Sequence, residues 1–87
     1  MKNKVLIKLI IPKLDLNLDF LIPVNDTIYK TKKIMLKTIT EFSNLTDEDV
    51  NRFILINKNT AKIYLNNEIV FSTDIRNATE LILFEKI

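Results

Sequence analysis

Apolar and polar residues alternate over two stretches near the start of the chain, which is the pattern of half-buried strands. In residues 4–11, KVLIKLII, every second position from Val5 is apolar and shares one face of an extended chain. In residues 16–22, LNLDFLI, the apolar face lies opposite Asn17 and Asp19. Pro12 and the turn-forming residues after it separate the two runs. The sequence therefore predicts an antiparallel hairpin with one buried face.

The apolar period changes after Pro23. Residues 27–43, placed at about 100° per residue, carry one apolar stripe, and lysines lie on the opposite side. Asn25 or Asp26 is expected to cap this helix by accepting hydrogen bonds from its first free N–H groups. One amphipathic helix should thus cover one face of the sheet, with a stripe formed by Ile28, Met35, Ile39 and Phe42.

The second half of the chain predicts a short helical turn and three more strands. Thr46, with Asp49 three residues later, has the spacing of a helix cap. Residues 52–56, 61–65 and 78–84 read as strands separated by asparagine-rich turns. Because the chain has no glycine, asparagine is expected to occupy the left-handed turn positions.

The order of these elements is strand, strand, helix, strand, short strand, strand. This is the plan of the β-grasp fold, an α+β architecture in which the first and last strands lie parallel in the middle of a mixed sheet. The most continuous apolar runs, VLIKLII and LILF, are those two strands, as expected for central positions. We predict a single domain over residues 1–87, with the sheet order 2-1-5-3-4 and one main helix across one face.

The sequence also resembles ubiquitin-like domains along nearly its full length. The residues DTI at 26–28 open the helix as in ubiquitin, and NRFIL at 51–55 matches a similar run of arginine followed by apolar residues. Ile75 lies six residues before Leu81, a spacing found in that fold between a loop isoleucine and the last strand.

Within this superfamily the chain is most similar to the YukD/EsaB-like proteins of type VII secretion loci in Gram-positive bacteria. The shared features are a lysine-and-valine first strand, the Ile22–Pro23 step before the helix, and the Asn57–Lys58 turn after the third strand. One departure is NAT at 77–79, where these proteins usually have a Gly-Asp-type turn. The resemblance implies a cytoplasmic, non-conjugating accessory of the secretion apparatus, with a membrane component of that apparatus as a possible protein partner.

Composition disfavours most enzyme classes. The chain lacks cysteine and histidine, and therefore lacks a thiolate zinc site, the usual general base and the commonest metal ligand. Without glycine it cannot form a Gly-rich phosphate loop. The carboxylates at 47–49 are candidate ligands of a hard cation, but acidic residues at a helix start explain them more simply. We expect no enzyme activity and no cofactor or metal.

The two end segments favour a cytoplasmic, non-conjugating protein. Lys8 interrupts the apolar run near the start, and no small-residue cleavage site follows it. No stretch approaches the ~20 apolar residues of a membrane span, so direct membrane insertion is not expected. Ubiquitin and the sulfur carriers act through a flexible C-terminal Gly-Gly, whereas this sequence ends in FEKI. Conjugation and sulfur carriage are therefore not expected.

Binding is the remaining function, and the strand pattern gives it a location. If Leu81 and Leu83 point under the helix, the apolar residues between and beside them point to the other face of the sheet. Contiguous apolar patches of this kind usually mark an interface. The predicted protein-binding residues are Leu6, Ile10, Ile54, Ile56, Ile82 and Phe84.

Alternatives remain open for this face and for the partner. A one-residue error in strand phase would move half of these residues inward, and a second layer would cover the rest. An open face suits either a foreign protein or a homodimer. Lys30, Lys33 and Lys37, with Lys32 to one side, form a basic row without aromatic residues, so nucleic acid is not the expected partner. The competing biological role is a β-grasp adaptor or assembly protein of an unrelated system, for example one associated with a phage or a toxin.

Overall fold

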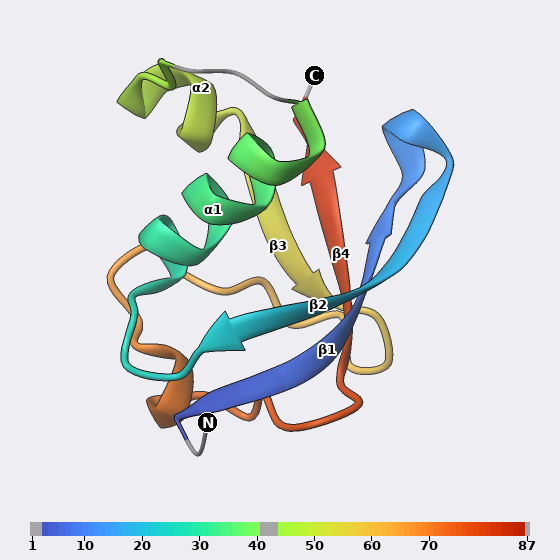
Figure 1. The fold of residues 1–87 in the computed structure, drawn as a ribbon, viewed down its shortest axis with the longest axis vertical. Helices are drawn as coiled ribbons and strands as arrows, with labels where there is room; N and C mark the ends of the chain where they lie inside the picture. Colours follow the sequence, from blue (N-terminus) through green and yellow to red (C-terminus); the bar gives the residue numbers. More distant parts are fainter. Residues whose placement is uncertain (1–2, 41–43, 87) are drawn as a thin grey trace.

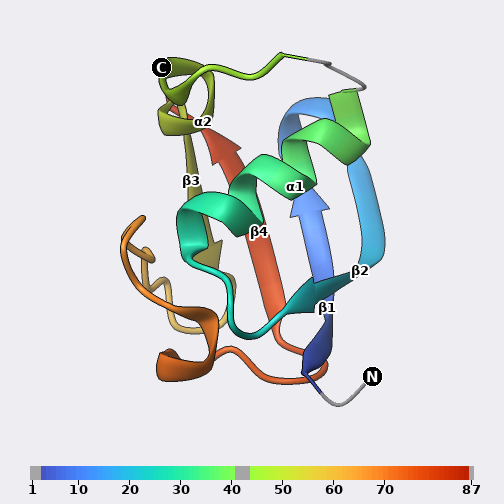
Figure 2. The same cartoon turned by 60° about the vertical axis from the view of Figure 1, so that its left-hand side comes forward.

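The computed structural model describes residues 3–40 and 44–86 and shows a mixed sheet with its helices on one face (Figure 1). The strands are β1 (Lys4–Ile11), β2 (Leu16–Pro23), β3 (Phe53–Asn57) and β4 (Glu80–Glu85). The helices are α1 (Ile28–Thr40) and α2 (Asp47–Asn51), and two single turns of 3₁₀ helix are η1 (Pro12–Leu14) and η2 (Val70–Ser72). Figure 2 shows α1 lying across the sheet on the inner face.

The strands lie in the order β2-β1-β4-β3. The two central strands, β1 and β4, are parallel, and each pairs antiparallel with the edge strand beside it. The α+β class, the helix across one face and the parallel central pair are all as predicted from the sequence.

The predicted fifth strand, residues 61–65, is reduced to an isolated bridge between Ile63 and Ile56, so the order 2-1-5-3-4 is corrected to four strands. Two backbone hydrogen bonds join this segment to β3, from the Asn57 amide to the Lys62 carbonyl and from the Tyr64 amide to the Leu55 carbonyl. The chain then turns back, because the Leu65 amide donates to the Glu68 carboxylate and the Glu68 amide to the Leu65 carbonyl. A turn therefore replaces further pairing.

The strand phases predicted from the alternating pattern are confirmed for the central strands. The inward-facing residues from Ile7 to Ile11 in β1, and Leu81 and Leu83 in β4, are completely buried in the core that these strands form with α1 and β3, and Val5 is half-buried against it. On the helix, Ile28 and Met35 are buried and Ile39 is half-buried, while Phe42 lies outside the described residues. The largest fully buried side chains are Ile7, Leu9, Ile11, Ile22, Ile28, Met35, Leu36, Leu55, Ile75, Leu81, Leu83 and Val50.

Thr27, not Asn25 or Asp26, caps α1. The Lys30 amide donates to the Thr27 hydroxyl oxygen at 3.2 Å, and the Thr31 amide donates to the Thr27 carbonyl at 2.9 Å. These are the two bonds expected of an N-cap residue. Thr27 is fixed at this position by a bridge to Ile69, a long-range pairing that the local sequence does not reveal.

The predicted cap of α2 is confirmed as a reciprocal pair. The Asp49 amide donates to the Thr46 hydroxyl oxygen, and the Thr46 amide donates to the Asp49 carboxylate, each at 3.1 Å. Together these bonds satisfy two backbone donors, which stabilises the start of a helix too short to form alone. The helix buries Val50 against the core.

Among the described residues, the left-handed positions belong to Asp15, Ala61 and Ala78, so the expectation that asparagine fills them is wrong. Asparagine shapes the turns through its side chain instead. The Asn57 amide oxygen accepts hydrogen bonds from the amides of residues 59 and 60, and the Ala61 amide then donates to the Asn57 carbonyl. This network holds Ala61 in a conformation that its Cβ disfavours.

Candidate functional site

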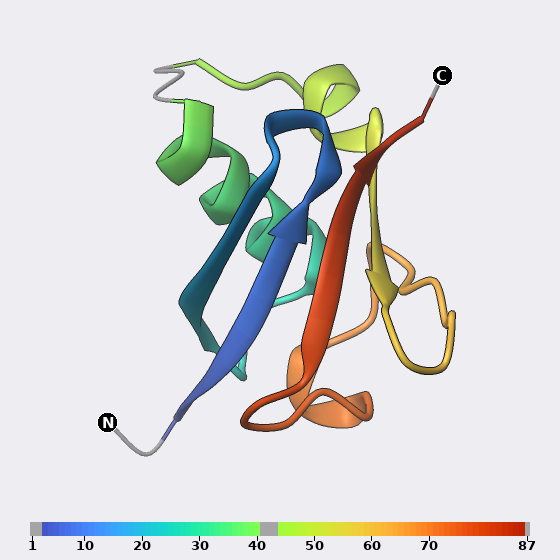
Figure 3. The same ribbon diagram turned by 90° about the vertical axis from the view of Figure 1, so that its right-hand side faces the viewer.

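The outer face of the sheet is the face opposite α1. No helix or strand within residues 3–40 and 44–86 covers it. Figure 3 shows β1 and β4 in front, with both helices behind the sheet. Phe84 is 42% exposed and Leu6 is 47% exposed, while Ile10, Ile54, Ile56 and Ile82 are half-buried by their neighbours in the sheet. All six residues predicted from the sequence therefore point away from the core.

Strand register brings five of these six residues into one block. Ile10 of β1 pairs with Ile82 of β4, and Ile82 pairs with Ile56 of β3. Ile54 and Phe84 form the next pair along the same two strands. Cross-strand neighbours on one face have Cβ atoms about 5 Å apart, close enough for these side chains to contact each other. We call Ile10, Ile54, Ile56, Ile82 and Phe84 the apolar block.

Leu6 is not part of the apolar block. It pairs with Leu21 of β2, which is 51% exposed, at the opposite end of the outer face. The Leu6 backbone is held by the loop before β4, because its amide donates to the Asn77 side chain and its carbonyl accepts from the Ala78 amide. The sequence-based prediction placed Leu6 on the correct face but joined it to the wrong neighbours.

A row of four charged residues separates Leu6 from the apolar block. From β2 to the end of β3, the row is Asp19, Lys8, Glu80 and Lys58. Asp19 and Lys8 are register partners with a 3.9 Å ion pair, and Lys58 and Glu80 form a second ion pair at 3.8 Å. Lys8 and Glu80 are also register partners. We call these residues the charged row; they line a shallow depression of about 360 Å³ together with Ile10 and Asn17.

Sequence reasoning missed two further apolar residues of this face. Ile63 is 52% exposed and lies beside Ile56, so it extends the apolar block past the edge of β3. Leu21 accompanies Leu6. The alternation in residues 16–22 gave a signal for Leu21, because this residue falls on the face of Asn17 and Asp19. No local signal marked Ile63.

Lys32 lies apart from the other three helix lysines. The Lys32 side chain is only 4% exposed, and its ammonium donates to the Phe53 carbonyl at 2.9 Å. Burial, together with the nearby Lys86 charge, holds the pKa of Lys32 below its usual range. Lys32 thus serves the packing of α1 against β3, and Lys30, Lys33 and Lys37 remain on the outer surface of the helix beside Ile34.

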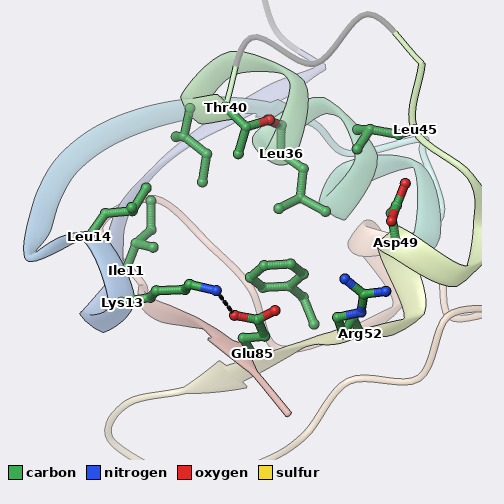
Figure 4. A pocket seen from close by; sticks show the side chains of 11 residues that line it. Ile11, Lys13, Leu14, Leu36, Thr40, Leu45, Asp49, Arg52 and Glu85 are labelled. Atoms are coloured by element: carbon green, nitrogen blue, oxygen red, sulfur yellow. Dashed lines mark hydrogen bonds and ion pairs between the residues drawn. The ribbon is translucent and has the colours of Figure 1, made fainter. Parts of the chain in front are cut away.

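A second hollow, of about 280 Å³, lies where the end of α1, α2 and the end of β4 meet (Figure 4). Its apolar lining includes Leu36, Leu45 and Phe53. Lys13 and Glu85 form an ion pair at its rim, and the Asp49 carboxylate is committed to the Thr46 cap. These charged groups stabilise the fold around the hollow, and their arrangement does not pair a nucleophile with a base.

A buried tyrosine has the clearest shift in acidity. The Tyr64 hydroxyl donates to the Asp74 carboxylate and accepts from the Asn57 side-chain amide. Burial and the Asp74 carboxylate raise the pKa of Tyr64 to about 12. A neutral phenol held in this way ties three segments of the chain together, which is a structural role.

Two of the three carboxylates at 47–49 have structural partners. Asp47 accepts a hydrogen bond from the Tyr29 hydroxyl, and Asp49 belongs to the cap of α2. In the described part of the chain, acidic side chains do not form a group of three arranged to hold a metal ion.

No helix among the described residues is long and apolar enough to cross a membrane.

Comparison with solved structures assigns the fold to the ubiquitin-like class. The N-terminal ubiquitin-like domain of the 4931431F19Rik protein superposes with a TM-score of 0.73 at 15% identity, covering 98% of this chain and 77% of that one. The ubiquitin-like domain of Plasmodium falciparum Dsk2 gives 0.72 at 16% identity, covering 95% and 99%.

The same fold also occurs in a different molecular setting. A chain from the toluene 4-monooxygenase HD complex with the inhibitor 4-bromobenzoate gives a TM-score of 0.74 at 7% identity, covering 95% of this chain and 99% of that one. No family model matches the sequence, and no curated protein matches it. At these identities the likeness establishes the ubiquitin-like fold and leaves function to be argued from the surface.

Proposed function

We propose that this protein is a non-covalent protein-interaction module that binds its partner through the outer face of the sheet. The observation that carries this proposal is the apolar block, in which five large side chains from three adjacent strands lie together on a face without covering elements in the described chain. Desolvating such a block provides the free energy of association, and the charged row beside it provides specificity. Catalysis, nucleic acid and membrane insertion have no part in this proposal.

The proposed setting is the cytoplasmic side of a type VII secretion system. The support is the resemblance of three sequence features to the YukD/EsaB-like proteins: the first strand, the Ile22–Pro23 step and the Asn57–Lys58 turn. In the structure these features position β1, end β2 and end β3. The proposed partner is a membrane component of the secretion apparatus, contacted through its cytoplasmic part.

The alternative is an assembly or adaptor protein of an unrelated system. The observation that favours it is the fold match to a chain of the toluene 4-monooxygenase complex, which shares only 7% identity with this protein. This match shows that the ubiquitin-like fold is not limited to one kind of partner.

Calorimetric titration with a purified partner tests both the surface and the setting. The ligand is the cytoplasmic domain of the secretion membrane component encoded in the same genome. Phe84→Asp should weaken binding at least about tenfold, because it buries a charge in an apolar contact. Ile34→Asp is the matched control: Ile34 is 36% exposed but lies on α1, on the other side of the sheet, so binding should not change.

Each other outcome removes a defined part of the proposal. Tight binding that Phe84→Asp leaves intact would exclude the outer face as the binding site. An absence of binding to the secretion component would overturn the secretion setting, and binding to another protein that Phe84→Asp abolishes would then support the adaptor alternative.

A further inference from the structure

In the charged row, any two residues at equal distances on either side of the midpoint carry opposite charges. Across the sheet the charges read negative, positive, negative and positive, with the midpoint between β1 and β4. The four side chains reach solvent, with side-chain exposures of 62% for Lys8, 63% for Asp19, 50% for Lys58 and 32% for Glu80. The row is therefore available to a molecule that packs on the outer face.

A half-turn about an axis parallel to the strands makes this row complementary to itself. When a second copy is placed face to face by this rotation, its β4 lies over β1 and its β3 lies over β2. Asp19 then faces Lys58 of the second copy, and Lys8 faces Glu80 of the second copy. A two-fold axis perpendicular to the strands would instead place each charge over its own copy, which is repulsive.

We propose that a second copy of this chain binds the outer face, related by a two-fold axis that runs parallel to the strands between β1 and β4. This inference rests on the proposed function, since it adds a second copy of the chain as a further partner of the same surface. The same rotation places Ile10 over Ile82 of the second copy and Ile56 over Asn17 of the second copy, so the end of the apolar block nearest the charged row joins the contact. Charge selects the orientation, and burial of the isoleucines supplies the attraction.

The geometry of packed sheets tolerates this arrangement. Face-to-face sheets lie about 10 Å apart and rotate by about 30°. With strands about 4.8 Å apart, the end positions of the row lie roughly 7 Å from the axis. The rotation therefore separates Asp19 and Lys58 of the second copy by roughly 4 Å sideways, a displacement that the long lysine side chain spans.

The interface is small, so the dimer should be weak. Four strands at about 4.8 Å and five residues at about 3.3 Å give a footprint of roughly 300 Å². Stable complexes bury about 800 Å² per partner. We therefore expect a reversible dimer with a dissociation constant on the order of 10–1,000 µM, visible only as the protein concentration rises.

The test is a variant in which all four charges are exchanged: Lys8→Glu, Asp19→Lys, Lys58→Glu and Glu80→Lys. Each ion pair within the sheet is preserved with reversed polarity, so the fold should be retained. Sedimentation velocity up to about 1 mM should show reversible dimers for the wild type and for the variant alone. In an equal mixture, native mass spectrometry should show mixed dimers far below the half share expected by chance, because like charges then face each other.

Three results would overturn the inference: a wild type that stays monomeric up to about 1 mM, mixed dimers at the half share expected by chance, or a dimer that Ile82→Asp leaves intact. Ile34→Asp serves as the control and should leave the dimer unchanged. A monomeric wild type that still binds a foreign protein through Phe84 would reject self-association and leave the proposed function standing. A dimer without any foreign partner would support self-association through the outer face and overturn the proposed secretion setting.

Discussion

At the scale of single residues, two alanines occupy backbone positions that normally suit glycine. Ala61 and Ala78 have φ angles of 63° and 72° in a chain without glycine. A Cβ atom in this region approaches the neighbouring carbonyl oxygen, so each position carries a steric cost. The absence of glycine is plain from the sequence, but the residues that take its place depend on hydrogen bonds accepted by the Asn57 side chain and carbonyl and by the Leu6 carbonyl.

Ala78→Gly should stabilise the fold. It relieves the left-handed strain, and the greater entropy of the unfolded glycine offsets part of the gain, leaving about 0.5–1 kcal/mol. Thermal unfolding should show a Tm increase of about 2–8 °C. Thr38→Gly is the control. Thr38 lies within α1, where glycine is unfavourable, so this substitution should lower Tm. A decrease on Ala78→Gly would show that the alanine methyl group makes a contact worth more than the strain.

Tyr64→Phe should destabilise the protein at neutral pH by about 1–2 kcal/mol, because it removes two hydrogen bonds and leaves the Asn57 amide without its phenol partner. The pKa of Tyr64 is raised to about 12 in the folded state, above its ordinary value of 10.0. Its contribution to stability is therefore complete below pH 10 and decreases as pH rises from about 10 towards 12.

Urea unfolding at pH 8 and pH 11 measures this effect. The difference in unfolding free energy between the wild type and Tyr64→Phe should shrink at the higher pH. The chain has two tyrosines, so Tyr29→Phe is the natural comparison. This variant keeps Tyr64, so its unfolding free energy should still decrease between pH 8 and pH 11 because of Tyr64. An unchanged difference at the two pH values would contradict the assigned pKa.

At the scale of elements, alternation predicted strand phase well and strand length less well. Two full alternating runs fixed which residues of β1 and β2 face the core, and Thr46 with Asp49 fixed the start of α2. Residues 61–65 were mistaken for a strand because five residues of suitable composition do not show where pairing stops. The cap of α1 was missed by one or two residues, since Thr27 is held by a distant pairing with Ile69.

The two faces of β4 provide a direct test of strand phase. Leu83 is completely buried, whereas its neighbour Phe84 is 42% exposed. Leu83→Ala should cost about 2–5 kcal/mol, because it leaves a cavity in the core. Phe84→Ala should cost less than about 1 kcal/mol in the isolated monomer. Chemical denaturation measures both; equal costs would show that the outer face is packed like a core.

At the scale of the whole molecule, the sequence predicted the topology because the most apolar runs must lie in the centre of the sheet. It placed all six proposed binding residues on one face, and the structure separates Leu6 from the other five. The charged row could not be predicted, because its four members come from four separate segments and only the register brings them together. Predicting the surface pattern therefore required the assembled sheet, whereas predicting the fold class did not.

The pairing of β1 with β4 also constrains how the protein is made. Residues 4–11 and 80–85 form the middle of the sheet, so β1 leaves the ribosome before its partner β4 and must wait for it. Until then β1 has only β2 beside it, and a lone hairpin is marginally stable in water. The edge of β1 that β4 will cover is therefore exposed until β4 emerges, and a chaperone or a neighbouring nascent chain has its best opportunity to bind during that time.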